Sequence, residues 1–315
     1  MRRRLSAIVS AVVLLATAGC AELAGSAPDR DDLENTFRTR ARIVADAWLS
    51  ATSSGAWLTG FVPLQELTVA PESGFGTDDA KQAFGAGWYV LRTDLPADRP
   101  ADGKIHFPDE TVMDVPLTSA REAYSAMDQG DPPPCADPNA TPPPPPSPGG
   151  PDTPVGEPAQ QSCVALTVTA VKLDKTMIRT SRGIVAVPAW LFTVDGLAEP
   201  IARVAVDLAA VSPVPTINVP PFTYTQGLVT AQDLVGVKGT ELTYRLGVGA
   251  CDEDIRPLMV ETPEMVLLAG TVVTTGGVCI DLLKLHPVTV RISEPLGDRA
   301  VLDGINGQPL VLTVR

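Results

Sequence analysis

The segment between Cys135 and Cys163 constrains the fold of this chain more than any other. It is rich in proline, glycine and serine, and the five prolines at 142–146 favour a stiff polyproline II rod that rises about 3.1 Å per residue. Such a run normally acts as a spacer. A disulfide between the two flanking cysteines would instead hold their Cα atoms only about 5.5–6 Å apart. We therefore predict that residues 131–162 form a disulfide-closed surface loop, and that the parts on either side of it are forced together.

The N-terminus has the features of an export signal. A basic start, Arg2 to Arg4, precedes an apolar stretch over residues 5–16 that is too short for a good membrane-spanning helix. The following TAGC, which ends at Cys20, resembles a bacterial lipobox, although Thr17 stands where that motif usually has leucine. The resemblance implies a signal peptide over 1–19, a lipid-modified Cys20, a tether over 20–28, and a location on the extracytoplasmic face of the cell membrane. The alternative is an ordinary secretory signal that is cut near Ala18.

The remaining cysteines predict two disulfides. Cys135, Cys163, Cys251 and Cys279 are an even number in an exported chain. Three pairings are possible. We expect Cys135–Cys163 and Cys251–Cys279, because strand candidates at 241–247 and 265–275 would return antiparallel and bring the second pair together. Zinc is the competing use of these thiols, but the sequence has no C-x-x-C pair and its two histidines are isolated, so we expect no metal site.

The charge of the chain excludes one class of partner. The formal net charge is −13, and removal of a signal that carries three arginines would bring it to −16. A strongly acidic protein repels nucleic acid, so we expect no nucleic-acid role. The acidity suits a protein outside the membrane and leaves the identity of a protein or envelope ligand open.

Residues 29–130 predict a small domain of helices and strands. A helix begins near Asp29 and ends at 53–55, because Leu33, Phe37, Ala41, Val44 and Trp48 recur at helical spacing on one face. Further elements are expected as strands at 67–70 and 88–91, a helix at 77–83, a hairpin at 104–116, and a helix at 119–127 that Ser119 caps.

Residues 163–315 predict a mainly antiparallel β domain. Strand candidates lie at 164–173, 177–180, 185–194, 201–210, 241–247, 265–275, 287–293 and 310–315. Short strands separated by Gly/Pro turns are typical of a sandwich or a barrel-like sheet. The predicted fold class is therefore α+β, with a helix-plus-strand N-terminal part docked on a sandwich-like C-terminal part.

Two segments of the second half carry a resemblance. TSRG at 180–183, followed by VPAWLFT at 187–193, and PLGDR at 295–299, followed by Asp303-Gly304, resemble segments of uncharacterised exported lipoproteins of high-GC Gram-positive bacteria. The resemblance implies no catalytic residues. On physical grounds we expect Gly183 to form a turn and Trp190 and Phe192 to point into the core. We also expect Arg299 to form an ion pair with Asp298 or Asp303.

No catalytic, cofactor-binding or metal-binding residues are predicted. The sequence lacks the usual hydrolase and phosphate-loop motifs, and neither His106 nor His286 has a signature around it. Asp252, Glu253 and Asp254 could bind calcium or act on a glycosidic bond, but we interpret them as a solvated loop beside Cys251. The predicted function is a lipid-anchored extracytoplasmic binding or interaction protein. The alternatives are a cell-envelope hydrolase acting on wall polymer and a purely structural envelope component.

Overall fold

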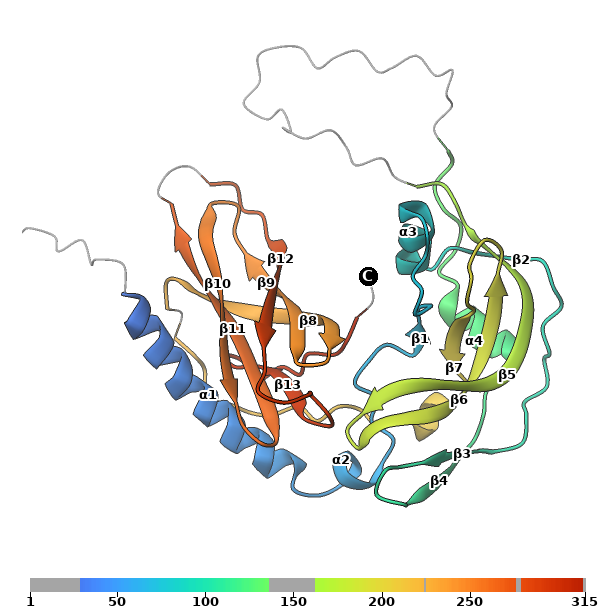
Figure 1. The fold of residues 1–315 in the computed structure, drawn as a ribbon, viewed down its shortest axis with the longest axis horizontal. Helices are drawn as coiled ribbons and strands as arrows, with labels where there is room; N and C mark the ends of the chain where they lie inside the picture. Colours follow the sequence, from blue (N-terminus) through green and yellow to red (C-terminus); the bar gives the residue numbers. More distant parts are fainter. Residues whose placement is uncertain (1–28, 136–161, 224, 276–278, 314–315) are drawn as a thin grey trace, which may run out of the picture.

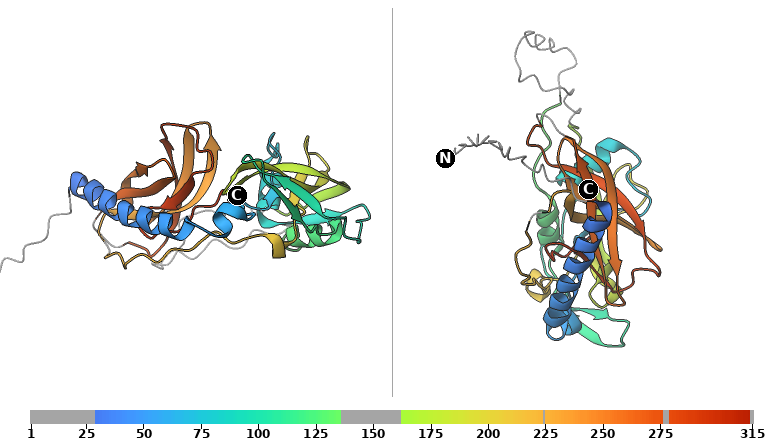
Figure 2. Two further views of the ribbon diagram at one scale, coloured as in Figure 1. Left: turned by 90° about the horizontal axis from the view of Figure 1, so that it is seen from below. Right: turned by 90° about the vertical axis from the view of Figure 1, so that its left-hand side faces the viewer.

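The computed structural model describes residues 29–135, 162–223, 225–275 and 279–313. They form two β-rich lobes that lie side by side (Figures 1 and 2). Lobe 1 contains residues 67–135 and 162–211, and lobe 2 contains residues 29–60 and the described part of 212–313. Residues 61–66, here called the strap, run between them. Helices are few and antiparallel strands many, which confirms the predicted α+β class.

Lobe 1 is built on a five-stranded sheet in the order β1-β7-β6-β5-β2. All of its strand pairs are antiparallel except β2 with β5. A separate hairpin of β3 and β4 and two helices, α3 and α4, complete the lobe. The bounds are β1 Thr68–Val69, α3 Asp78–Ala86, β2 Tyr89–Leu91, β3 Gly103–His106, β4 Val112–Val115, α4 Ala120–Met127, β5 Leu166–Thr180, β6 Gly183–Val194 and β7 Ile201–Val204, followed by a 3-10 turn, Leu208–Ala210.

Lobe 2 is a sheet in the order β10-β11-β8-β9-β12, and β13 pairs in parallel with β11. The sheet curls, because its two outer strands, β10 and β12, approach each other. One hydrophobic core fills the inside of the curl, and a second lies between the sheet and α1. The bounds are α1 Arg30–Thr52, α2 Ala56–Thr59, β8 Leu228–Lys238, β9 Glu241–Val248, β10 Asp252–Glu261, β11 Met265–Thr274, β12 Lys284–Arg291 and β13 Ala300–Asp303.

Helix α1 forms as its apolar spacing predicts, but it packs on the C-terminal sheet (Figure 2). Its predicted apolar face is buried against Met265, Leu267 and neighbouring residues of lobe 2. The fit is close at Gly304, where a Cβ atom would lie 2.6 Å from the ring of Phe37. Gly304 therefore leaves room for the helix to approach the sheet.

The two lobes do not coincide with the predicted domains at 29–130 and 163–315. Lobe 2 takes α1 from the N-terminal part, and lobe 1 takes β5 to β7 from the C-terminal part. Apolar periodicity shows which face of a helix or strand is buried, but it does not show against which other element that face packs. The prediction that the proline-rich segment brings its flanks together is supported, since Tyr89 to Leu91 pair with Leu166 to Val168 across it.

Several element boundaries also differ from expectation. β5 is one continuous strand where two were predicted, and β8, β10 and β13 were not predicted. The strand predicted at 310–315 does not form over residues 310–313, where Leu312 makes only isolated bridges. The acidic run Asp252–Asp254 begins strand β10 and is not a loop, because Asp252 and Glu253 pair with Thr274 and Val273 of β11, and Asp254 lies in the bulge that follows. Trp190 and Phe192 are buried as predicted, and the indole Nε1 of Trp190 donates to the carbonyl of Thr118 at 2.9 Å.

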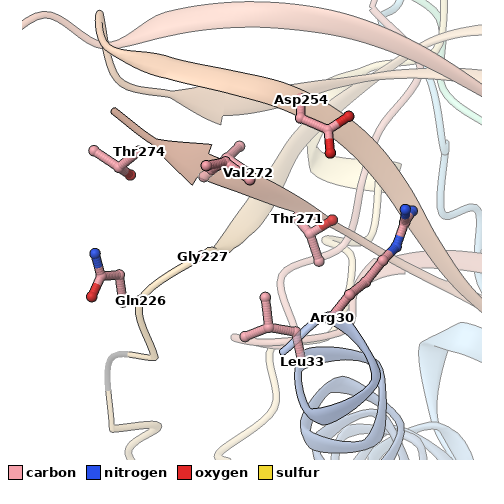
Figure 3. Close-up of a pocket in the computed structure, with 9 residues that line it drawn as sticks. Arg30, Leu33, Gln226, Gly227, Asp254, Thr271, Val272 and Thr274 are labelled. Carbon is pink, nitrogen blue, oxygen red and sulfur yellow. The ribbon is translucent and has the colours of Figure 1, made fainter. Parts of the chain in front are cut away.

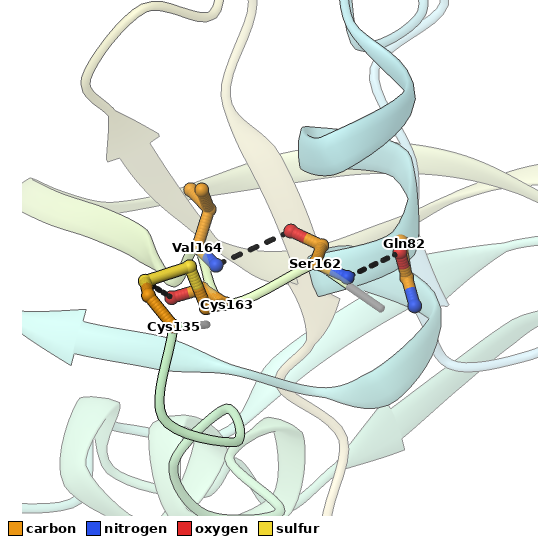
Figure 4. The surroundings of a disulfide bond; sticks show 5 residues. All are labelled: Gln82, Cys135, Ser162, Cys163 and Val164. Atoms are coloured by element: carbon orange, nitrogen blue, oxygen red, sulfur yellow. Dashed lines mark hydrogen bonds between the residues drawn. A yellow bond between two sulfur atoms is a disulfide. The ribbon is translucent and has the colours of Figure 1, made fainter. Parts of the chain in front are cut away.

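Both predicted disulfides are present. Cys135 pairs with Cys163 at a Cα–Cα distance of 4.9 Å, and Cys251 pairs with Cys279 at 6.0 Å. Beside the first bond, the amide of Ser162 donates to the side-chain oxygen of Gln82 on α3 at 3.1 Å (Figure 4). The residues between Cys135 and Ser162, the signal peptide and Cys20 lie outside the described residues, so the predictions for them stay predictions.

The strap joins the two lobes through backbone hydrogen bonds. On one side Leu64 N donates to Arg179 O at 2.8 Å, and Ser181 N donates to Val62 O at 3.0 Å. On the other side Leu312 N donates to Leu64 O at 3.0 Å. Phe61 enters the core of lobe 1, whereas Val62 and Leu64 enter the core of lobe 2. Residues 61–64 thus contribute side chains to both cores.

Candidate functional site

Lobe 1 contains a cavity of about 390 Å³ around Arg203, here called the Arg203 cavity. It lies where the C-terminal ends of α3 and α4 meet strands β1, β2 and β7. A volume of this size suits a small organic ligand. The cavity is lined by Glu66, Leu67, Thr68, Phe84, Gly85, Gly87, Tyr89, Ala126, Met127, Gln129 and Arg203.

The ends of the two helices shape its wall. Gly87 terminates α3 in the left-handed conformation at φ 71°, which a residue with a side chain rarely adopts. A Cβ atom there would lie 2.6 Å from the side chain of Gln129. The backbone N–H of Gln129 donates to the carbonyl of Gly87 at 2.8 Å. Helix α4 starts with a capping box between Ser119 and Glu122. The bond between Gly87 and Gln129 holds the C-terminal end of α3 next to the residue that follows α4, whereas the capping box fixes the opposite end of α4.

Arg203 is a cation within an otherwise apolar strand. Its Nη1 donates to the hydroxyl of Thr68 at 2.9 Å. Burial lowers the pKa of Arg203, and the nearby Tyr89 and Glu66 act in the opposite direction. An arginine side chain stays protonated in proteins, so the cavity contains a fixed positive charge.

Tyr89 lines the same cavity and carries a buried hydroxyl. The residue is only 4% exposed, and within the described part of the chain its hydroxyl has no hydrogen-bond partner. Burial raises the pKa of Tyr89, and Asp128 and Tyr124 raise it further, so the group stays a neutral hydroxyl at physiological pH. A buried hydroxyl without a partner costs about 1–3 kcal/mol. The protein therefore retains a costly polar group that a ligand could satisfy.

A second cavity of about 210 Å³ adjoins the first and shares Arg203 and Ala126 with it. Here Arg99 forms ion pairs with Glu122 and Asp207, each at 2.6 Å. The hydrogen bond from Arg99, followed by those from Ser119, lowers the pKa of Glu122 to about 2. Arg203 thus lies between two cavities along the same face of α4.

Both positive and negative groups surround the Arg203 cavity. Arg203 provides a cation, while Glu66 and the carbonyl ends of α3 and α4 provide negative potential. A dianion such as phosphate would be repelled by the helix ends. A molecule with both a carboxylate and an ammonium group would match Arg203 at one end and the carbonyls at the other.

The residues considered from the sequence do not assemble into a reactive site. His106 is exposed on β3 in lobe 1, and His286 is exposed on β12 in lobe 2. Asp254 pairs with Arg256 at 2.7 Å, and Asp252 accepts hydrogen bonds from Gly249 N and the hydroxyl of Thr274 at 2.6 and 2.7 Å. Over the described ranges, no three His, Cys, Asp or Glu side chains are grouped so as to hold a metal ion.

The ion pair expected for Arg299 has a different partner. Its Nη1 lies 2.5 Å from the carboxylate of Glu261, while Asp303 accepts three backbone N–H groups, from Ala231, Ile305 and Asn306, at 2.6 to 3.0 Å. The pairing was predicted from closeness in sequence. The extended strand β13, Ala300–Asp303, carries Asp303 away from Arg299, and β10 brings Glu261 to the arginine from elsewhere in lobe 2.

Tyr89, Arg203 and Glu66 were not identified as site residues from the sequence. One signal was present, since Arg203 interrupts the apolar run Ile201 to Val206. A lone charge in a buried strand needs a structural or functional partner. Tyr89 gave no such signal, because a tyrosine in the strand Trp88 to Leu91 is an ordinary core residue.

Comparison of the chain with protein-family models, with curated proteins and with solved structures finds no match. Among the described residues, no helix combines the length and the apolar character that crossing a bilayer requires.

Proposed function

We propose that this chain is a lipid-anchored extracytoplasmic binding protein, and that its Arg203 cavity binds a small zwitterionic molecule such as an amino acid or a short peptide. The proposal is carried by one observation: Tyr89, whose buried hydroxyl has no hydrogen-bond partner among the described residues, lines the same cavity as Arg203. Arg203 and the Tyr89 hydroxyl together can bind a carboxylate. Glu66 and the carbonyl ends of α3 and α4 can bind the ammonium group.

Support for the lipid anchor comes from the sequence. The basic start, the short apolar stretch and TAGC ending at Cys20 resemble the pattern that signal peptidase II recognises, with Thr17 in place of the usual leucine. Two or three acyl chains on Cys20 would anchor the protein durably, because each buried methylene contributes about 0.8 kcal/mol. We expect Cys20→Ala to release the protein from the membrane fraction or to stall its processing. Membrane-bound protein with an unchanged mature N-terminus would contradict the anchor.

The binding function can be tested on protein extracted from its native membrane. Native mass spectrometry should show a small molecule bound to the intact chain, and chemical analysis should identify an amino acid or peptide. In Arg203→Met this species should be lost. Arg245→Met is a suitable control, because Arg245 is also a half-buried strand arginine and pairs with Asp233 in lobe 2, away from the cavity. Retention of the ligand by Arg203→Met, or equal loss in both variants, would contradict the proposal.

A further inference from the structure

One end of lobe 2 presents a group of exposed apolar side chains, here called the apolar tip. Ile280 and Leu283 are 69% and 66% exposed. Val273, Leu282 and Leu285 are each about half exposed. A soluble protein normally spreads such side chains over its surface, and a cluster of them marks an interaction site.

The strand ends bring these residues to one place. Strand β11 ends at Thr274 and β12 begins at Lys284, while β9 ends and β10 begins on either side of Cys251. The Cys251–Cys279 disulfide ties these ends together. Leu283 lies over Gly247, where a Cβ atom would be 3.2 Å from a Leu283 methyl group. The tip is therefore held by the sheet.

Helix α1 begins at the same end of the lobe. Arg30 and Leu33 of its first turn line a cavity of about 140 Å³ together with Thr271 and Thr274 of β11 (Figure 3). Val273 also lines this cavity and remains 55% exposed. The chain thus enters lobe 2 beside the apolar tip.

We propose that the apolar tip rests in the surface of the lipid bilayer to which the chain is anchored. This proposal rests on the lipid anchor proposed above. Cys20 is separated from Asp29 by a tether that can span at most about 30 Å. A short tether gives an effective concentration in the millimolar range, so even a weak contact would be occupied.

The composition of the tip favours lipid. Each apolar side chain that moves from water into the acyl region is stabilised in proportion to the apolar area that it buries. Lys284 is accompanied by Asp252, Glu253 and Asp281, so the tip has no basic cluster that would attract anionic lipid. The contact is therefore apolar. It requires neither anionic lipid nor low salt.

The test uses tryptophan fluorescence in brominated phosphatidylcholine vesicles. The mature chain from residue 21 is tethered to a nickel-chelating lipid by an N-terminal hexahistidine tag, which makes the test independent of the modification of Cys20. We compare Leu283→Trp with Ile184→Trp in lobe 1, whose parent isoleucine is 58% exposed. The emission of the tryptophan added at position 283 should fall roughly twofold, as expected for a group 5–10 Å deep in the interface.

The emission of Ile184→Trp should stay unchanged, and replacing part of the lipid with an anionic lipid should not increase the quenching at position 283.

A second comparison avoids any disturbance that the added indole ring causes. Without the tag and at millimolar lipid, the double variant Ile280→Ser with Leu283→Ser should float with vesicles less than wild type, whereas Ile184→Ser should float as wild type does. Equal quenching at both positions would overturn the proposal. So would a concentration-dependent dimer in the absence of vesicles that Leu283→Ser abolishes, because a second copy would then cover the tip.

Discussion

The hydroxyl of Ser181, at the tip of the β5–β6 hairpin of lobe 1, donates to the carbonyl of Trp57 in lobe 2 at 2.7 Å. The next residue, Arg182, donates to the carbonyl of Thr59 at 3.2 Å and stacks on the ring of Phe107 at 3.6 Å. The segment 180–183, one of the two on which the resemblance to exported lipoproteins rests, is therefore more than a turn. It connects the hairpin of lobe 1 to the end of the helical segment of lobe 2.

Removal of this hydroxyl should weaken the junction. Ser181 is buried, so Ser181→Ala leaves the Trp57 carbonyl without its donor and should lower the free energy of unfolding by about 1–3 kcal/mol. Ser53→Ala is the matched control, because Ser53 makes the same kind of bond, to Ser50 O at 2.9 Å, on an exposed helix end. Denaturant unfolding measures both. Equal, small effects would show that the junction bond contributes nothing.

Asp303 should make stability depend on pH in an unusual direction. Burial raises the pKa of Asp303 to about 6, although the backbone N–H bonds that it accepts oppose the shift. A carboxyl whose pKa is raised on folding stabilises the protein fully below its unfolded pKa, about 3.9, and loses this contribution as pH rises through about 6. We therefore expect the stability difference between wild type and Asp303→Asn to fall between pH 4 and pH 7. A difference that grows over this range would mean that the N–H bonds prevail.

The two disulfides should contribute similar stabilisation, because both join residues 28 positions apart. The chain-entropy account assigns about 3.5 kcal/mol to a loop of this size. Cys251→Ser with Cys279→Ser, and separately Cys135→Ser with Cys163→Ser, should each lower the free energy of unfolding by a few kcal/mol. Thermal unfolding of the two double variants measures this. An unchanged melting temperature in either variant would contradict the account for that bond.

Shortening the proline-rich segment should have little effect while its disulfide is intact. Closure entropy varies only with the logarithm of loop length, so deletion of residues 141–148 changes it by less than about 0.5 kcal/mol. The melting temperature should stay close to that of the full chain. A large drop would show that this segment packs against the lobes.

Local features of the fold were predictable from the sequence, and long-range contacts were not. The apolar face of α1, the Ser119 cap and both disulfides follow from spacing and residue type. The partner of α1 does not, because Phe37 would suit any apolar surface and the room at Gly304 appears only in the folded protein.

The candidate site could not be predicted from the sequence, because it too depends on long-range contacts. The Arg203 cavity combines the strap, two helix ends and three strands that are far apart in the chain. Glu66, Tyr89 and Arg203 carry no shared spacing. Their meeting depends on the parallel pairing of β2 with β5 and on the return of β7 to β1.

The measurement that tests the account most directly compares two tyrosine-to-phenylalanine variants for stability and for affinity. The hydroxyl of Tyr244 donates to Ala269 O at 2.7 Å in the core of lobe 2, whereas that of Tyr89 has no partner among the described residues. Affinity is measured calorimetrically for the tightest binder among amino acids and dipeptides. If Tyr89 serves a ligand, Tyr89→Phe keeps or gains up to about 1 kcal/mol of stability and loses up to about tenfold in affinity. Tyr244→Phe shows the reverse, with lower stability and unchanged affinity. A Tyr89→Phe variant that is less stable and binds as well as wild type would contradict the claim that this cavity is a binding site.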